Sequence, residues 1–273
     1  MYNVFYIEEI ETKLEKIREK HNINYHPLEI KLFDGHGGYD SEYSEIYVVL
    51  CLPLPLKGYI SWELDLIKEK YPNYYKTIYK LLLDVIKTPY NDIARENLLV
   101  LVRKLQKYEK DEKTRYVLKE IIENFLLAPA HKRIGALISH LFTESHEMGH
   151  ALFQRILNEN YSKHPEFSEG FSDAYAYYII LDSIERGYLP SETLYILPKL
   201  RNQNDSLEVH MRGYKLFELD RIIREDRIKH LLTEGRNRNR RKASSILKKE
   251  VLSVMEKNVG NFRNQLISFN NKE

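Results

Sequence analysis

The spacing of apolar residues along this chain predicts a largely helical protein. Ile7, Ile10, Leu14 and Ile17 recur at three- and four-residue intervals, which places them on one face of a helix over residues 5–20. The same periodicity predicts further helices over residues 61–70, 74–87, 91–108, 111–127, 134–157, 166–186, 191–201, 207–233 and 240–257.

Two segments near the N-terminus have the pattern of strands instead. Residues 28–33 (LEIKLF) alternate, residues 45–52 (EIYVVLCL) are rich in β-branched and apolar residues, and a glycine-rich turn separates them. We therefore expect a hairpin or small sheet, and an α+β fold that is predominantly helical. The expected parts are an N-terminal helix and sheet (1–60), an inserted helical block (61–130) and a C-terminal helical region (131–273), which could all form one compact domain.

Composition narrows the class of protein. The 273 residues are 43% hydrophobic with a formal net charge of +2, which is ordinary for a globular protein and argues against one that coats nucleic acid. The basic run over residues 236–242 is a weak hint of nucleic-acid binding, but such a run is more often a solvated loop. No apolar run is long enough to span a membrane and no N-terminal signal precedes the first helix, so a cytoplasmic location is expected.

The single cysteine, Cys51, lies in an apolar run and has no partner for an internal disulfide. The simpler interpretation is a buried strand residue. The alternative is a thiolate that blocks a metal in a latent form of the protein.

The strongest chemical signal is the segment HEMGH followed, eighteen residues later, by EGFSD. His146 and His150 are four residues apart, so on a helix they share one face and can bind one Zn²⁺. Glu147 lies between them, and Glu169 on the following helix is placed to be a third protein ligand. Three protein ligands leave a fourth position for water or substrate, which is typical of catalytic rather than structural zinc.

Each residue of this segment has an expected role. Glu147 accepts a proton from the attacking water and passes it to the leaving amine. Asp173, four residues after Glu169, accepts the free ring N–H of a liganding histidine, His146, and fixes its tautomer. The alternative interpretation is two helix histidines beside solvated carboxylates.

This arrangement resembles the gluzincin metallopeptidases, which have HExxH on one helix and a glutamate ligand on the next. The resemblance is to the clan rather than to one family, because different short matches point to different branches: Glu169-Gly170-Phe171 to the aminopeptidase-N-like branch, Glu169-x-x-Ser172-Asp173 to the thermolysin-like branch, and Met148-Gly149-His150-Ala151-Leu152 to the thimet-oligopeptidase group. It covers about residues 131–215 and implies a zincin-like core with one zinc ion per chain.

Weaker parts of the resemblance suggest further site residues. In thermolysin-like enzymes a downstream histidine, paired with an aspartate five residues earlier, stabilises the oxyanion, and His210 with Asp205 has this spacing. A tyrosine also stands eleven residues after the second zinc histidine, as Tyr161 does here. The alternative for His210 is a histidine on a helix surface or first turn. The clan also implies that an edge strand pairs with extended substrate, and residues 45–52 are the candidate.

The sequence therefore predicts a zinc-dependent peptidase that acts on a peptide or protein. A first alternative is a metal-binding regulatory or interaction protein without proteolytic activity. A second keeps the metal chemistry but applies it to a non-peptide amide or an epoxide.

Overall fold

A computed structural model describes residues 7–26, 37–40, 45–48, 67–87, 92–127, 130–157, 163–200, 208–233 and 240–270. The chain divides into two compact units. One contains residues 1–27, 37–47 and 141–273, and the other contains residues 28–36 and 48–140. The residues of the HEMGH and EGFSD segments all belong to the first unit.

The second unit is helical over its described residues. Its elements are α3 (Pro72–Lys87), α4 (Asp92–Tyr108), α5 (Glu112–Glu120) and a π-helical turn, η1 (Ile121–Leu126). These agree with the helices predicted over 74–87, 91–108 and 111–127. Asp111 caps α5 by accepting a hydrogen bond from the Thr114 backbone N–H at 2.9 Å, which satisfies one of the free donors at the helix start.

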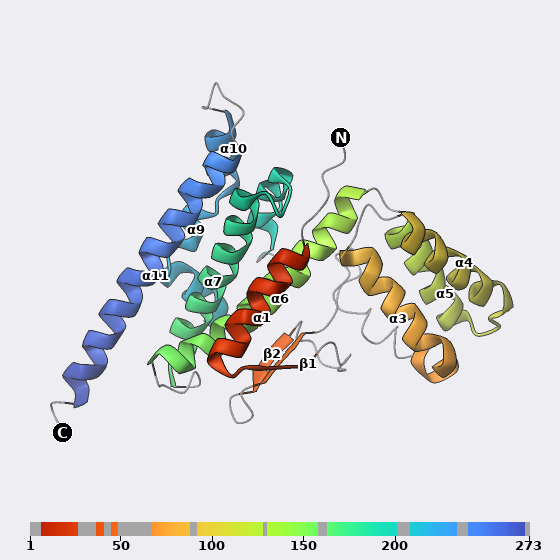
Figure 1. Cartoon of the computed structure of the whole chain (residues 1–273), viewed down its shortest axis with the longest axis horizontal. Helices are drawn as coiled ribbons and strands as arrows, with labels where there is room; N and C mark the ends of the chain where they lie inside the picture. Colours follow the sequence, from red (N-terminus) through yellow and green to blue (C-terminus); the bar gives the residue numbers. More distant parts are fainter. Residues whose placement is uncertain are drawn as a thin grey trace. The chain divides into compact units, whose positions relative to one another are not determined.

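The first unit contains four principal helices among its described residues (Figure 1). They are α1 (Ile7–His21), α6 (Ala130–Leu157, from Leu141 onward), α7 (Pro165–Arg186) and α11 (Arg240–Asn270). Shorter elements lie between α7 and α11 in sequence: η3 (Ser191–Tyr195), η4 (Leu197–Lys199), α8 (Glu208–Leu216), α9 (Leu219–Ile222) and α10 (Glu225–Thr233). None of the described helices is both long and apolar enough to cross a membrane.

The predicted α+β fold with an N-terminal hairpin is wrong, because the described chain is a helical protein. Within the part of the chain that the structure describes, the strands are β1 (Asn24–His26), β2 (Gly37–Asp40) and β3 (Glu45–Val48), three to four residues each. β1 pairs in parallel with β3, with Tyr25 opposite Ile46, and parallel strands cannot be joined by a hairpin turn. Residues 28–33 lie outside the described residues.

The order of these strands also bears on the expected docking strand. The order is β1-β3-β2, so β3 is the central strand and both of its edges are occupied. Over Glu45–Val48 the segment is therefore not an edge that could pair with a substrate. Residues 49–52 and Cys51 lie outside the described residues.

The predicted helix over residues 207–233 is interrupted. Glu218 has a left-handed backbone conformation (φ 52°) between α8 and α9, and α10 follows as a separate helix. A residue other than glycine in this conformation gives no sequence signal of a break. The helix predicted over 191–201 consists of two 3₁₀ turns, and the one predicted over 240–257 continues to Asn270.

Helix α7 is the central element of the first unit. It contacts α8 and α11, and it is buried on nearly all sides between Ser168 and Ile184. This matches its sequence, which has few charged residues on any face. Pro165 starts the helix, and Gly187 ends it in the left-handed conformation (φ 81°) with its N–H bonded to the Ile184 carbonyl.

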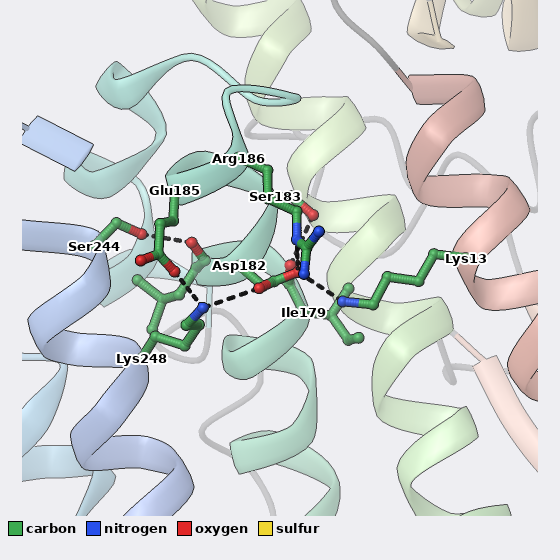
Figure 2. A network of polar contacts seen from close by, with 9 residues as sticks. Lys13, Ile179, Asp182, Ser183, Glu185, Arg186, Ser244 and Lys248 are labelled. Carbon is green, nitrogen blue, oxygen red and sulfur yellow. Dashed lines mark hydrogen bonds and ion pairs between the residues drawn. The ribbon is translucent and has the colours of Figure 1, made fainter. Parts of the chain in front are cut away.

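A buried ionic network fixes the C-terminal part of α7 (Figure 2). The Asp182 carboxylate accepts hydrogen bonds from Lys13 of α1 at 2.7 Å and from Lys248 of α11 at 3.0 Å. Arg186, one turn later on α7, donates to the same carboxylate at 2.8 Å, and Glu185 forms an ion pair with Lys248. Three helices are thereby joined through one buried aspartate, which is 2% exposed.

Candidate metal centre

Helix α6 places His146, Glu147 and His150 together in the interior of the first unit. All three are buried, and apolar neighbours such as Leu141 and Phe153 bury the same helix. The rings of His146 and His150 lie with their centroids 4.7 Å apart and their planes at 87°. Their Nε2 atoms point toward each other at 3.1 Å, as the four-residue spacing on one helix face predicts.

Close packing of α6 on α7 is made possible by Gly149. A Cβ atom at this position would lie 2.5 Å from the Cα of Ser172, so only glycine fits between the two backbones. Gly149 stands between the two histidines and Ser172 precedes Asp173. The close approach therefore brings the ligand-bearing turn of α6 directly against the carboxylate-bearing turn of α7.

Helix α7 supplies the carboxylates. One oxygen of Glu169 lies 3.2 Å from His146 Nε2, and the other lies 3.5 Å from His150 Nε2. Asp173, one turn later, is fully buried, and its Oδ1 lies 2.8 Å from His146 Nδ1. Glu169 thus lies next to the Nε2 atoms of both histidines, while Asp173 contacts His146 at Nδ1, on the other side of the ring.

The Nδ1 atoms of both histidines have hydrogen-bond partners on α7. A carboxylate only accepts, so the Nδ1 of His146 must carry a proton and donate it to Asp173. The Nδ1 of His150 is 2.8 Å from the hydroxyl of Ser168, which is also buried. When His146 is neutral, its proton on Nδ1 leaves a lone pair on Nε2, which is the form in which histidine binds a metal. The Ser168 hydroxyl can donate or accept, so its bond to His150 is compatible with the same tautomer.

The electrostatics of this cluster favour a cation. Burial alone would lower the pKa of His146, but hydrogen bonds to Asp173 and Glu169 outweigh it and raise that pKa above its ordinary value. Burial alone would raise the pKa of Glu169, but the His146 and His210 side chains hold it well below its usual range. Two carboxylates at a buried site therefore stabilise positive charge there, whether it is a proton on an imidazole or a metal ion.

The spacing of the donor atoms fits a tetrahedral zinc site. With bonds of about 2.0–2.1 Å, two ligand atoms of a tetrahedron are about 3.3–3.4 Å apart. The two Nε2 atoms are 3.1 Å apart, and each faces a different oxygen of the Glu169 carboxylate: His146 lies 3.2 Å from Oε2 and His150 lies 3.5 Å from Oε1. These residues could therefore hold one zinc ion with little movement.

His210, on the first turn of α8, adds a fourth side chain to the cluster. Its Nδ1 lies 2.7 Å from Glu169 Oε2, and His146, Glu169 and His210 form a second group of donors within 4.8 Å of one another. The distance of 2.7 Å is shorter than the separation of about 3.3 Å expected for two atoms bound to one zinc ion, so His210 Nδ1 and Glu169 Oε2 would have to move apart to bind the same ion.

The structure thus brings together five of the residues that the sequence singles out: His146, His150, Glu169, Asp173 and His210. Glu147 is buried on the same helix as the first two. Tyr161 and Asp205 lie outside the described residues. Sequence reasoning missed Ser168. Its only signal is its position next to Glu169, from which a short side chain can reach the preceding helix.

Comparisons with models of known protein families, with curated proteins and with solved structures gave no significant match.

Proposed function

We propose that this protein is a zinc-dependent peptidase in which His146, His150 and Glu169 hold the metal and Glu147 is the general base. The observation that supports the proposal is the convergence of two Nε2 atoms and one carboxylate at mutual distances of 3.1–3.5 Å, with each imidazole oriented by its own partner on α7. A cation bound where these atoms converge would be stabilised by the lone pairs and the negative charge that surround it.

The chemistry divides between the metal and the chain. Bound zinc would supply a Lewis acid that lowers the pKa of water to about 7. Glu147 is buried beside the two histidines, accepts a proton from the attacking water and delivers it to the leaving nitrogen. Asp173 and Ser168 hold the histidine rings in the orientation that presents Nε2, and Glu169 contributes the negative charge that retains a dication.

The peptide substrate is inferred from the sequence motif. HExxH, eighteen intervening residues and a glutamate followed by Ser172-Asp173 resemble the gluzincin peptidases. Because β3 is the central strand of its sheet, Glu45–Val48 has no free edge for an extended peptide and gives no support for this substrate class. A broad peptide library is therefore the appropriate first screen.

The test begins with metal content. Protein purified without chelators or a histidine tag should contain close to one zinc per chain by elemental analysis, and His150→Ala should lose it. Glu147→Gln should keep the zinc and lose turnover, because the amide cannot accept the proton. Cleavage by Glu147→Gln at the wild-type rate would show that the proposed mechanism is wrong.

The second candidate function is a metal-binding regulatory or interaction protein without proteolytic activity. The observation that favours it is His210, because a fourth protein ligand would close the coordination sphere, as in structural zinc sites. Zinc-loaded wild-type protein that cleaves no member of the peptide library, and that shows three imidazole ligands by X-ray absorption, would support this candidate.

A further inference from the structure

We infer that His210 is a positioning residue that acts through Glu169, and that it neither binds the metal nor contacts the substrate. The inference rests on the proposed function, since it assigns a role toward the same metal ligands. It concerns the hydrogen bond between His210 Nδ1 and Glu169 Oε2, at 2.7 Å, between the first turn of α8 and the first half of α7.

First, each of the three proposed ligands has a polar partner outside the ligand set. His146 donates to Asp173, and His150 pairs with the Ser168 hydroxyl. Glu169 is the remaining ligand, and His210 stands in the corresponding place with an N–H directed at the carboxylate. Ligating carboxylates in metal sites are generally hydrogen-bonded in this way, and the bond fixes which oxygen faces the metal.

The second argument is that the backbone holds His210 in this position. Gly213, one turn after His210, lies so close to α7 that a Cβ atom there would be 2.4 Å from the Glu166 carbonyl oxygen and 3.2 Å from the Cβ of Glu169. Gly170, beside Glu169, has the same relation to α8, since its Cβ would be 2.3 Å from the Gly213 carbonyl oxygen. Helix α8 is therefore packed against the turn of α7 that carries Glu169.

The third argument concerns the two ring nitrogens of His210. Because a carboxylate only accepts, Nδ1 carries a proton and is committed to Glu169. A metal ligand would need a lone pair on that nitrogen, so the observed bond and metal binding through Nδ1 exclude each other. A role in oxyanion stabilisation would instead depend on Nε2, the other ring nitrogen.

Two isosteric substitutions separate the ring nitrogens. In His210→Asn the amide nitrogen lies near the position of Nδ1, so the bond to Glu169 is retained and Nε2 is lost. In His210→Gln the amide nitrogen lies near the position of Nε2, so the bond to Glu169 is lost. His210→Ala removes both, and His230→Ala, at an exposed position on α10, is the matched control.

The measurement is zinc affinity by competition with a chromophoric chelator, with folding of each variant checked by circular dichroism. We expect His210→Asn and His230→Ala to bind zinc within about threefold of wild type, and His210→Ala and His210→Gln to bind about 10–100-fold more weakly. The kcat of His210→Asn on a cleavable peptide should also remain near the wild-type value.

A double-mutant cycle gives a second readout. If His210 acts through Glu169, then His210→Ala should weaken zinc binding little further when Glu169 is already alanine. X-ray absorption should find two imidazole ligands in both wild type and His210→Ala.

The possible outcomes distinguish this inference from the proposed function. Three imidazoles in wild type, additive losses in the cycle, or unchanged zinc affinity in His210→Ala would each overturn the positioning role and leave the metal site intact. If His210→Asn binds zinc as wild type does but is inactive, Nε2 of His210 takes part in the reaction, and the positioning role is overturned. A wild-type protein that takes up no zinc would overturn the proposed function together with this inference.

Discussion

The contact between Gly149 and Ser172 leads to a prediction that tests how the site is built. A Cβ atom at position 149 would lie 2.5 Å from the Cα and 2.9 Å from both the Cβ and the Oγ of Ser172. Ordinary carbon–carbon contacts are about 3.5–4.0 Å, so α6 and α7 would have to separate locally by about 1 Å. The obstructing atom belongs to the backbone and cannot rotate away.

The magnitude follows from two opposing effects of Gly149→Ala. Overpacking of this kind costs about 1–3 kcal/mol, and we expect the upper end because backbone must move. Replacing glycine by alanine within a helix returns about 1 kcal/mol. The expected net loss is about 2 kcal/mol, or a fall in melting temperature of about 4–8 °C for a unit of this size.

The matched control is Gly260→Ala. Gly260 lies in α11 with no atom within 4 Å of the added Cβ, so only the helix propensity changes. This variant should be more stable than wild type by about 0.5–1 kcal/mol. The two alanine substitutions are therefore expected to have opposite signs.

The assay combines thermal unfolding of the metal-free protein with zinc affinity. A separation of about 1 Å is large beside hydrogen bonds such as that between His146 and Asp173, so Gly149→Ala should also weaken zinc binding at least about tenfold. If Gly149→Ala is as stable as Gly260→Ala and binds zinc as wild type does, the close approach of the two helices does not set the geometry of the site.

Two further predictions concern buried carboxylates and their partners. Asp182→Asn should lower the free energy of unfolding by about 3 kcal/mol at neutral pH, because Lys13 and Lys248 would lose the negatively charged carboxylate that both of them contact. Burial alone would raise the pKa of Asp182, but its hydrogen bonds to these lysines hold it at about 2, below the ordinary 3.8. Its stabilisation is therefore present above pH 3.8 and is lost as the pH falls toward 2. In urea unfolding, lowering the pH from 7 to 2 should reduce the free energy of unfolding of wild type by about 2 kcal/mol more than that of Asp182→Asn, in which the other carboxylates still titrate. Asp173→Asn and Ser168→Ala should each weaken zinc binding about 10–100-fold by releasing one imidazole; equal affinity to wild type in chelator competition would contradict this orientation role.

The sequence indicates the helices and the local grouping of site residues well, because both depend on short-range periodicity. The four-residue spacing of His146 and His150 requires a shared helix face, and α6 provides it. The predicted contact between Asp173 and His146 is present at 2.8 Å, because Asp173 lies one turn after Glu169 on a helix packed against α6.

What sequence reasoning could not supply depends on long-range packing. The predicted strand over residues 45–52 is present over Glu45–Val48, but its partner β1 was not predicted, because the three residues Asn24–His26 are too few to show an alternating pattern. The break at Glu218 has no glycine or proline to mark it. The contact of His210 with Glu169 depends on how closely α8 approaches α7 at Gly170, and a glycine in a helix does not reveal which backbone lies against it.

Helix α7 carries two separate buried carboxylate sites, and their positions explain how the proposed metal ligands are kept in register. Glu169 and Asp173 face α6, while Asp182 is bound from α1 and α11 by Lys13 and Lys248. Each buried carboxylate opposes rotation of α7 about its axis, because rotation would leave an unpaired charge in the interior. The Asp182 network therefore holds the Glu169 face of α7 toward α6 without a metal, and the proposed metal site would require less ordering of the chain on binding zinc.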